Sequence, residues 1–238
     1  MDKAQAEALL KDSARGVGVE LHKAQIERFI LYMDILLEWN RRMNLTAVTE
    51  PRDIIIKHFA DSLSLAPFIT GGARVIDVGT GAGFPGVPLL ISNSGITLTL
   101  LDSQNKRVVF LRSLLAELGL SAECAHARAE DAGRDPHFRE RFDFAVSRAV
   151  SRLNALAELC LPFARPGGAF IAMKGPDAGE EMREARAAIL RLGGRTEEIM
   201  RVNPGGNIAH TLIIVRKLSQ TPPKYPRRPE KIAKCPLV

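Results

Sequence analysis

The stretch that decides the fold is VIDVGTGAGFPG, which spans residues 75–86. Its first residues are mainly apolar and β-branched, as in a buried strand. Glycine then occupies every second position from Gly79 to Gly83, and Pro85 stands where the first turn of a following helix accepts proline. A strand that passes through a glycine loop into a helix predicts the first βα unit of a parallel sheet, with the loop open to a ligand.

Strand-like and helix-like segments alternate along the rest of the chain. Further strands are predicted at 97–102, 122–130, 142–150, 169–175, 197–202 and 210–217. Helices are predicted at 84–92, 104–119, 151–168 and 180–192. This alternation predicts an α/β fold of the Rossmann-like type, with a mostly parallel seven-stranded sheet covered by helices. Only a short Gly/Pro loop separates the last two strands, so that pair is predicted to be antiparallel.

Residues 1–70 lack this alternation and predict helices. Apolar residues recur at helical spacing over 22–42. Thr49 is placed to cap a second helix over 51–68. The sequence thus divides into an N-terminal helical extension (1–70), a ligand-binding domain built on the sheet (71–218) and a basic proline-rich tail (219–238).

The positive charge of the chain is concentrated at its end. From Arg216 onward there are seven Lys or Arg and one acid, which accounts for the whole formal net charge of +6. Five prolines in the same segment keep it from forming a long helix and predict an extended chain. Such a tail suits contact with a polyanion such as nucleic acid, and equally a solvated role that improves solubility.

Cysteine usage and the lack of long apolar runs indicate the cellular setting. Three isolated cysteines form no C-x-x-C pair, and an odd number argues against a disulfide framework. The N-terminus carries no apolar signal core, and no run approaches the roughly 18 apolar residues of a membrane span. The histidines and cysteines show no metal-ligand spacing. We therefore expect a cytoplasmic, monomeric protein with no membrane segment and no metal.

Two ligand classes compete for the glycine loop. Residues 81–86 match G-x-G-x-x-G, the dinucleotide fingerprint, with Asp102 about twenty residues on as the ribose acid. Residues 77–83 also form D-x-G-x-G-x-G, which places Asp77 beside the glycines. A carboxylate there would repel a pyrophosphate but suits S-adenosylmethionine (AdoMet), which carries an ammonium and a sulfonium and no phosphate. Asp77 therefore favours AdoMet, with direct contact, contact through water and a role in holding the loop left open.

Two further positions follow strand ends where a nucleoside would lie. Asp102 ends the second predicted strand, and one carboxylate can accept from both hydroxyls of a ribose; the alternative is a cap on the following helix. The Ala129–Glu130 segment follows the third. It is predicted to contact adenine through its acid or its backbone, against the alternative that Glu130 and Asp131 cap a short helix.

Several stretches of the sequence resemble the bacterial 16S ribosomal RNA guanine-N7 methyltransferases, also known as the glucose-inhibited division protein B family. They are EWNRRMNLTAVTEPRDIIIKHFADSL, VIDVGTGAGFPGVPL, LLDSQNKRVVFLR, RAED, FDFAVSRAV and AMKG. WNRRMNLT followed by KHFADS makes the resemblance specific, because general AdoMet enzymes do not need these motifs. The resemblance implies a Rossmann-like AdoMet-dependent methyltransferase with an N-terminal helical extension, acting on 16S rRNA of the small ribosomal subunit.

The resemblance also implies roles for individual residues, and it adds Arg148 to the site. Together with the loop residues, the predicted cofactor site comprises Asp77, Gly79, Gly81, Gly83, Phe84, Asp102, Ala129, Glu130 and Arg148. The predicted substrate contacts are Arg128, Arg148 and Lys174. Matching positions that either shape the site or fix their helix on the sheet are His58, Asp61 and Ser62.

The implied reaction needs no general base. Guanine N7 has an in-plane lone pair and no proton to lose, so the enzyme has to align N7 with the methyl group and exclude water. Arg148 is expected to position substrate or cofactor rather than to touch N7. Because A-form RNA hides N7 in its deep groove, the target is expected in a loop or out of its stack. Two alternatives remain open: a nicotinamide-dependent oxidoreductase, and a non-catalytic RNA-binding protein on the same fold.

Overall fold

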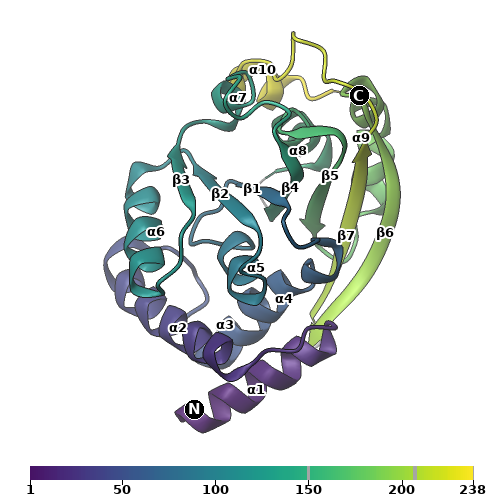
Figure 1. Cartoon of the computed structure of the whole chain (residues 1–238). Helices are drawn as coiled ribbons and strands as arrows, with labels where there is room; N and C mark the ends of the chain where they lie inside the picture. The colour runs from purple at the N-terminus through teal and green to yellow at the C-terminus, as the bar shows by residue number, and fades with distance from the viewer. Residues whose placement is uncertain (149–150, 206–207, 238) are drawn as a thin grey trace.

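The computed structural model describes residues 1–148, 151–205 and 208–237. Its centre is a seven-stranded sheet with the order β3-β2-β1-β4-β5-β7-β6 (Figure 1). The strands are β1 (Arg74–Val78), β2 (Thr97–Asp102), β3 (Glu123–His126), β4 (Phe142–Arg148), β5 (Ala164–Lys174), β6 (Gly194–Gly205) and β7 (Ile208–Lys217). β7 runs antiparallel to β5 and to β6, and the other neighbouring pairs are parallel. The predicted mostly parallel sheet with an antiparallel last pair is confirmed.

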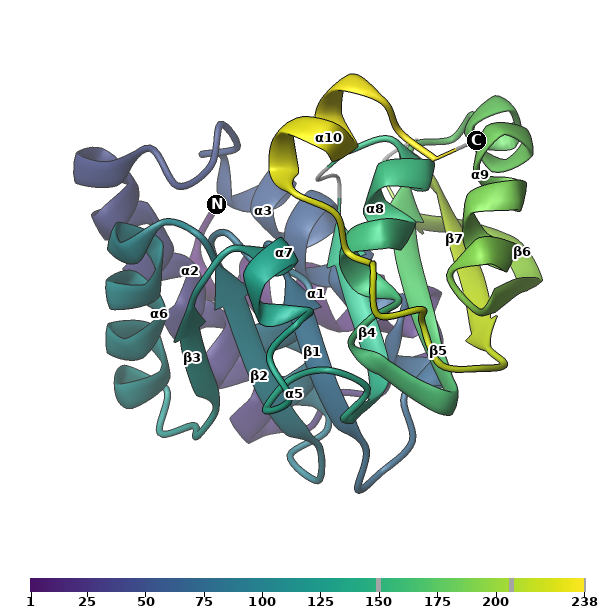
Figure 2. The same ribbon diagram turned by 90° about the horizontal axis from the view of Figure 1, so that it is seen from above.

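Helices precede the sheet and cover both of its faces (Figure 2). The N-terminal ones are α1 (Lys3–Gly16), α2 (Lys23–Met43), α3 (Pro51–Ile54), the π-helix η1 (Ile55–Ala60), α4 (Asp61–Leu63) and the 3₁₀-helix η2 (Ala66–Phe68). The later ones are α5 (Gly86–Ser92), α6 (Asn105–Glu117), α7 (Ala129–Ala132), α8 (Leu153–Cys160), α9 (Gly179–Arg191) and α10 (Pro229–Lys234). Among the described residues, no helix has the length and apolar character needed to cross a membrane.

Two hydrophobic clusters, one on each face of the sheet, hold the layers together. Alternation along β5 places Ile171 in the first cluster and Phe170 in the second. The first cluster also contains Phe29 and Tyr32 of α2, and each large apolar side chain buried in this way contributes about 1.5–3 kcal/mol. The N-terminal helices are thus packed onto the sheet, and the domain boundaries at 70 and 218 stay a prediction.

The strand order reverses between β1 and β4. The chain moves outward from β1 to β2 and β3 and then returns to pair β4 with the other edge of β1. Ligands of open α/β sheets bind beyond the carboxyl ends of the strands at such a point. β1 ends at Val78 before the glycine loop, and β4 ends at Arg148, so both predicted functional segments lie at this position.

Two predicted segments differ from the structure here, and part of another lies outside the described residues. The third strand was predicted over 122–130, but β3 ends at His126 and the Ala129–Glu130 segment begins α7, with Arg128 at its N-cap. The helix predicted over 51–68 is continuous only over 51–63, where its middle part η1 is π-helical, and a separate 3₁₀ turn follows at 66–68. The fourth strand was predicted to reach 150, and its positions 149–150 lie outside the described residues.

The helix predicted over 151–168 is wrong in its second half. α8 ends at Cys160, and β5 begins at Ala164. Gly168, the last residue of the predicted helix, lies inside β5, where a Cβ would stand 2.5 Å from the carbonyl oxygen of Asp143. The glycine is therefore required by the close approach of two strands rather than by the end of a helix.

The C-terminal tail is docked rather than extended and free as predicted. Residues 219–237, here called the C-terminal strap, fold back and end in the six-residue helix α10, which lies beside α7 and α8 (Figures 1 and 2). Tyr225 is 4% exposed, and Arg139 donates to the carbonyl oxygens of Thr221 and Tyr225 at 2.6 and 2.9 Å. The prolines prevent a long helix, as expected, but they do not prevent docking.

Candidate active site

The glycine loop after β1 has a backbone that only glycine adopts without strain. Gly79, Gly81 and Gly83 have φ values of 73°, 61° and 99°. A Cβ at Gly83 would stand 2.7 Å from the hydroxyl of Tyr32, whereas within the described residues a Cβ at Gly81 would meet no atom within 4 Å apart from its chain neighbours. Gly83 is thus needed for packing, and Gly81 faces open space.

Asp77 holds this loop from beneath. Its side chain is wholly buried, and Oδ2 accepts from the Thr80 hydroxyl at 2.7 Å and from the Gly86 amide at 2.8 Å. Burial raises the pKa of Asp77 to about 6. Of the three roles left open by the sequence, holding the loop matches this geometry, because a wholly buried carboxylate is closed to direct contact with a cofactor.

Asp102 ties the end of β2 to the same loop. Oδ2 accepts from the Gly81 amide at 2.9 Å and from Arg107 Nη1 at 3.4 Å, and Oδ1 accepts from the Gln104 amide at 2.8 Å. Gln104 is itself the N-cap of α6, so Asp102 precedes the helix and does not cap its first turn. Each carboxylate oxygen offers two lone-pair sites, so Oδ1 can still accept from a ribose hydroxyl. The ribose role of Asp102 stays a prediction.

A cavity of about 180 Å³, here called the small cavity, lies where the predicted nucleoside contacts meet. The loop, the end of β2 and the start of α7 line it, and its residues include Gly79, Asp102, Arg128, Ala129, Glu130 and Leu159. The groups that line the cavity fit an adenosine. They are a bare backbone at Gly79, a carboxylate at the ribose position, and short side chains at the ring position. Arg128 is exposed at its rim.

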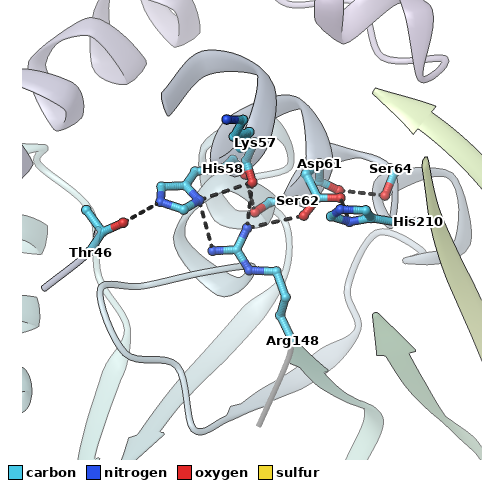
Figure 3. Close-up of polar contacts among 8 residues, drawn as sticks. All are labelled: Thr46, Lys57, His58, Asp61, Ser62, Ser64, Arg148 and His210. Carbon is cyan, nitrogen blue, oxygen red and sulfur yellow. Dashed lines mark hydrogen bonds and ion pairs between the residues drawn. The ribbon is translucent and has the colours of Figure 1, made fainter. Parts of the chain in front are cut away.

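A second cavity, of about 620 Å³ and here called the large cavity, opens beside Arg148. Arg148 donates through Nη1 to the carbonyl oxygen of Lys57 at 3.1 Å and to Asp61 Oδ2 at 3.2 Å, and its Nη2 lies 3.4 Å from His58 Nδ1 (Figure 3). The side chain is 16% exposed. These bonds occupy three of its five N–H groups, and Nε–H and one Nη2–H have no partner among the described residues. Arg148 thus joins η1 to β4 and retains donors for a ligand.

Phe84 connects the glycine loop to this arginine. Its ring lies 4.8 Å from the Arg148 guanidinium carbon and 4.6 Å from the His58 ring centroid, and it stacks on Tyr32 at 5.3 Å. The Tyr32 hydroxyl donates to the Ala82 carbonyl oxygen at 2.5 Å. An arginine over an aromatic face gains a cation–π attraction that strengthens when water is excluded.

Asp61 is the buried anion that balances this site. It is 0% exposed, and its Oδ1 lies 2.5 Å from His210 Nδ1, although no hydrogen bond of good geometry reaches that oxygen within the described chain (Figure 3). Ser62 turns inward to donate to the His58 carbonyl oxygen at 2.6 Å, so it stabilises the helix and does not face the cavity. His58 and Asp61 therefore line the site, and Ser62 fixes the helix.

His210 lines the large cavity but is absent from the sequence-based predictions. The antiparallel pairing contained the signal that would have found it. Lys174 at the end of β5 pairs with Thr211, so the start of β7 has to lie at the mouth formed by the carboxyl end of β5. Lys174 itself donates to the Ser151 carbonyl oxygen and to Glu181, both at 2.7 Å, and is mostly buried.

The two strongly shifted groups of the site give opposite pH dependences. Burial and the nearby Arg148 lower the pKa of His58 to about 4. An unfolded histidine has a pKa of about 6.5, so the unfolded chain binds more protons at His58 between these values, and the stability that His58 contributes falls as pH falls through this window. At Asp77 the folded chain binds more protons between about pH 4 and 6, so its contribution falls as pH rises.

We expect His58→Gln to remove the first of these dependences. Across pH 4 to 6.5, the Tm of the variant should rise less with pH than the Tm of the unchanged protein, or should fall, because only the Asp77 contribution remains. Thermal melts at half-unit pH steps measure the difference. Parallel Tm–pH curves would show that His58 titrates normally in the folded state.

Comparison with known proteins identifies the family. The family model described as rRNA small subunit methyltransferase G matches residues 25–208. The chain belongs to this family. A methyltransferase G of Alkaliphilus oremlandii is 50% identical over 233 residues, which cover 96% of this chain and 98% of the relative. Another, from Symbiobacterium thermophilum, is 46% identical and covers 100% of both chains. The family match decides against the oxidoreductase and the non-catalytic protein.

Solved structures agree with this family at the level of the fold. The structure of M. jannaschii TYW2 in complex with AdoMet has a TM-score of 0.53 and 11% identity, and the match covers 66% of this chain and 75% of that one. At this identity the likeness shows the fold alone. The predicted Rossmann-like methyltransferase fold is thereby confirmed. Among the described residues, no group of three or more His, Cys, Asp or Glu is placed to hold a metal ion.

Proposed function

We propose that this member of the methyltransferase G family transfers a methyl group from AdoMet to N7 of a guanine in 16S rRNA of the small ribosomal subunit. Family membership gives the coarser activity, an AdoMet-dependent rRNA methyltransferase. The observation that carries the proposal is the position of one loop at two cavities. Gly79 lines the small cavity, and Phe84 of the same loop lies against Arg148, which lines the large one.

The small cavity is proposed to hold the nucleoside of AdoMet. Gly79, Gly81 and Gly83 keep the loop backbone bare, Asp102 accepts from the ribose, and Ala129 and Glu130 border the adenine. Asp77 acts by holding the loop, and Phe84 acts by packing against Arg148. When bound, AdoMet supplies a methyl group on a positively charged sulfur. This sulfur is the leaving group and needs no protonation.

The large cavity is proposed to receive the guanine. Lys174 and the remaining donors of Arg148 are suited to phosphate or to guanine O6, and Arg128 is proposed to contact RNA at the rim of the small cavity. Asp61 and Glu181 offset the charges of Arg148 and Lys174. This balance is important because the purine ring becomes positively charged on methylation, and an uncompensated cation beside it would raise the barrier.

The reaction asks of the protein alignment and exclusion of water rather than a base. N7 has no proton to remove, and no carboxylate or histidine is needed to activate it. Phe84 packs against both Tyr32 and His58, and His58 lines the large cavity, so this wall is held by a packed aromatic group. Holding two reactants in line in such a site can supply several kcal/mol of the barrier reduction.

Methyl transfer from labelled AdoMet tests the proposal. We expect label in 16S rRNA when small ribosomal subunits from a strain without the enzyme, or the naked RNA, are the substrate. Chemical identification should place the label on guanine N7 in one loop or unstacked position, because a paired guanine hides N7 in the deep groove. RNA methylated at another base would overturn the finer proposal and leave the family activity standing.

We also propose that the enzyme works in the cytoplasm as a monomer without a metal ion. The chemistry supports the last point, because the sulfonium is already an activated methyl donor and N7 is already a nucleophile, so no Lewis acid is required. The ribosomal RNA substrate supports a cytoplasmic location. Light scattering and activity in the presence of EDTA test the oligomeric state and the metal requirement.

A further inference from the structure

The C-terminal strap is attached to two elements that line the small cavity. Leu159 of α8 lines this cavity, and Ala129 and Glu130 of α7 line its other wall. The strap runs past both elements, with α10 beside α7 and α8 in both views (Figures 1 and 2). It lies beyond residues 25–208, which the family model matches. None of the predicted roles uses this attachment.

The attachment to α8 is a buried pair between Arg227 and Glu158. Glu158 is 0% exposed and immediately precedes Leu159. Its Oε1 accepts from the backbone amide and from Nε of Arg227 at 2.8 and 2.9 Å, and its Oε2 accepts from Nη2 at 2.7 Å. Such a bidentate pair fixes the orientation of the two side chains as well as the distance between them. Because the carboxylate of Glu158 is fully buried, water cannot take the place of the arginine.

The attachment to α7 runs through two arginines that follow it. Arg134 donates through Nε to the Pro226 carbonyl oxygen at 2.9 Å and through Nη2 to the Lys224 carbonyl oxygen at 3.3 Å. Arg139 donates through Nη1 to the carbonyl oxygens of Gly133, which ends α7, and of Tyr225 in the strap, at 2.7 and 2.9 Å. The strap residues 224–227 are therefore bonded to Glu158, which is next to the cavity-lining Leu159, and to two arginines that follow α7.

We propose that the strap positions the cofactor by holding α7 and α8 at a fixed separation, with Arg227 as its main positioning residue. This inference rests on the proposed function, because it takes the small cavity as the site of the AdoMet nucleoside. When the cavity walls are already ordered, AdoMet binding does not carry the free-energy cost of ordering them. Loss of the strap contact therefore weakens AdoMet binding and leaves the methyl-transfer step unchanged.

The charge of Arg227 is committed to this internal contact, which separates the inference from an RNA-binding tail. Its neighbour Arg228 is exposed and makes no side-chain hydrogen bond or ion pair with the described residues. Arg227→Ala and Arg228→Ala therefore remove the same charge from adjacent positions. A tail that binds RNA by charge loses affinity for RNA in both variants, whereas a positioning strap changes only with Arg227.

The test compares AdoMet binding by calorimetry, and KM and kcat for methyl transfer, in the full-length variants. Arg227→Ala should raise Kd and KM for AdoMet roughly tenfold, with kcat at saturating AdoMet and KM for RNA within about twofold of the parent protein. Arg228→Ala should leave the values for AdoMet unchanged. Arg227→Lys should recover part of the affinity, because it keeps the charge but loses the second parallel bond.

Arg134→Gln provides a second variant that leaves the buried Arg227–Glu158 pair intact. It should also weaken AdoMet binding, with little change in kcat. A folded Arg227→Ala protein with the parent's Kd for AdoMet would overturn the inference, as would equal losses in RNA affinity alone for Arg227→Ala and Arg228→Ala. If Arg227→Ala fails to fold, Arg227→Lys and Arg134→Gln decide the question. Failure of the parent protein itself to bind AdoMet would instead overturn the proposed function.

Discussion

Replacement of Gly81 by valine should raise the Kd for AdoMet by at least about 100-fold while the chain stays folded, a loss of roughly 2.7 kcal/mol or more. Among the residues that the structure describes, no atom other than those of the chain neighbours lies within 4 Å of a Cβ at this position, so valine meets open space and not the core. This open space lies beside the glycine loop, and the same loop lines the small cavity. The left-handed backbone, with φ of 61°, adds a strain of roughly 1–2 kcal/mol for any other residue.

Gly83→Val supplies the matched control on the same loop. There a Cβ would stand 2.7 Å from the Tyr32 hydroxyl and 2.9 Å from Val87 Cγ2, so the variant should lose stability before it loses anything else. Calorimetric titration of AdoMet and thermal melts, made on both variants, separate the two cases. A Gly81→Val protein that binds AdoMet like the parent would remove the loop from the cofactor site.

Replacement of Arg148 by lysine should lower kcat/KM for methyl transfer by about 100-fold, which corresponds to roughly 2.7 kcal/mol. The guanidinium bonds Asp61 and the Lys57 carbonyl oxygen at once and lies over Phe84. Lysine keeps the charge but, as a single point, cannot span these partners. Asp61 would then be buried without its full compensation, and breaking such a pair costs roughly 3–5 kcal/mol.

The pair Arg165–Asp143 is a suitable comparison for this variant. It is also an Arg–Asp pair between β4 and β5, with the atoms 2.8 Å apart, but the arginine side chain is 51% exposed and lines neither cavity. Arg165→Lys should leave methyl transfer unchanged and shift stability by no more than about 1 kcal/mol. Equal effects of the two variants on kcat/KM would show that Arg148 has no special place in the reaction.

Much of the fold was predictable because apolar periodicity is a local property. Val75 and Ile76 face opposite clusters, and the same alternation along β5 follows directly from the sequence. The end of α8 was not predictable, since Gly168 looks like a helix stop and is in fact required by the approach of Asp143 in the neighbouring strand. Such a contact exists only after the sheet has formed.

The same distinction between local sequence patterns and contacts formed only on folding applies to the site residues. Asp102 and the glycines could be proposed as site residues because each ends or directly follows a predicted strand, and the role of Asp77 in holding the loop was among the alternatives left open. His210 and Glu158 were missed because their partners, Asp61 and Arg227, are distant in the chain and meet only in the folded protein. The role of the basic tail was predicted from its composition, and composition does not reveal that Arg227 is already paired with a carboxylate of the same chain.

Tyr32 has a consequence for engineering. It belongs to α2, in the N-terminal extension, and yet its hydroxyl holds the Ala82 carbonyl oxygen and fills the space that a side chain at Gly83 would need. A transplant of residues 71–218 alone into a chimera would leave the glycine loop without this support and with a gap where the phenol ring stood. A graft that is meant to carry the AdoMet loop has to carry helix α2 with it.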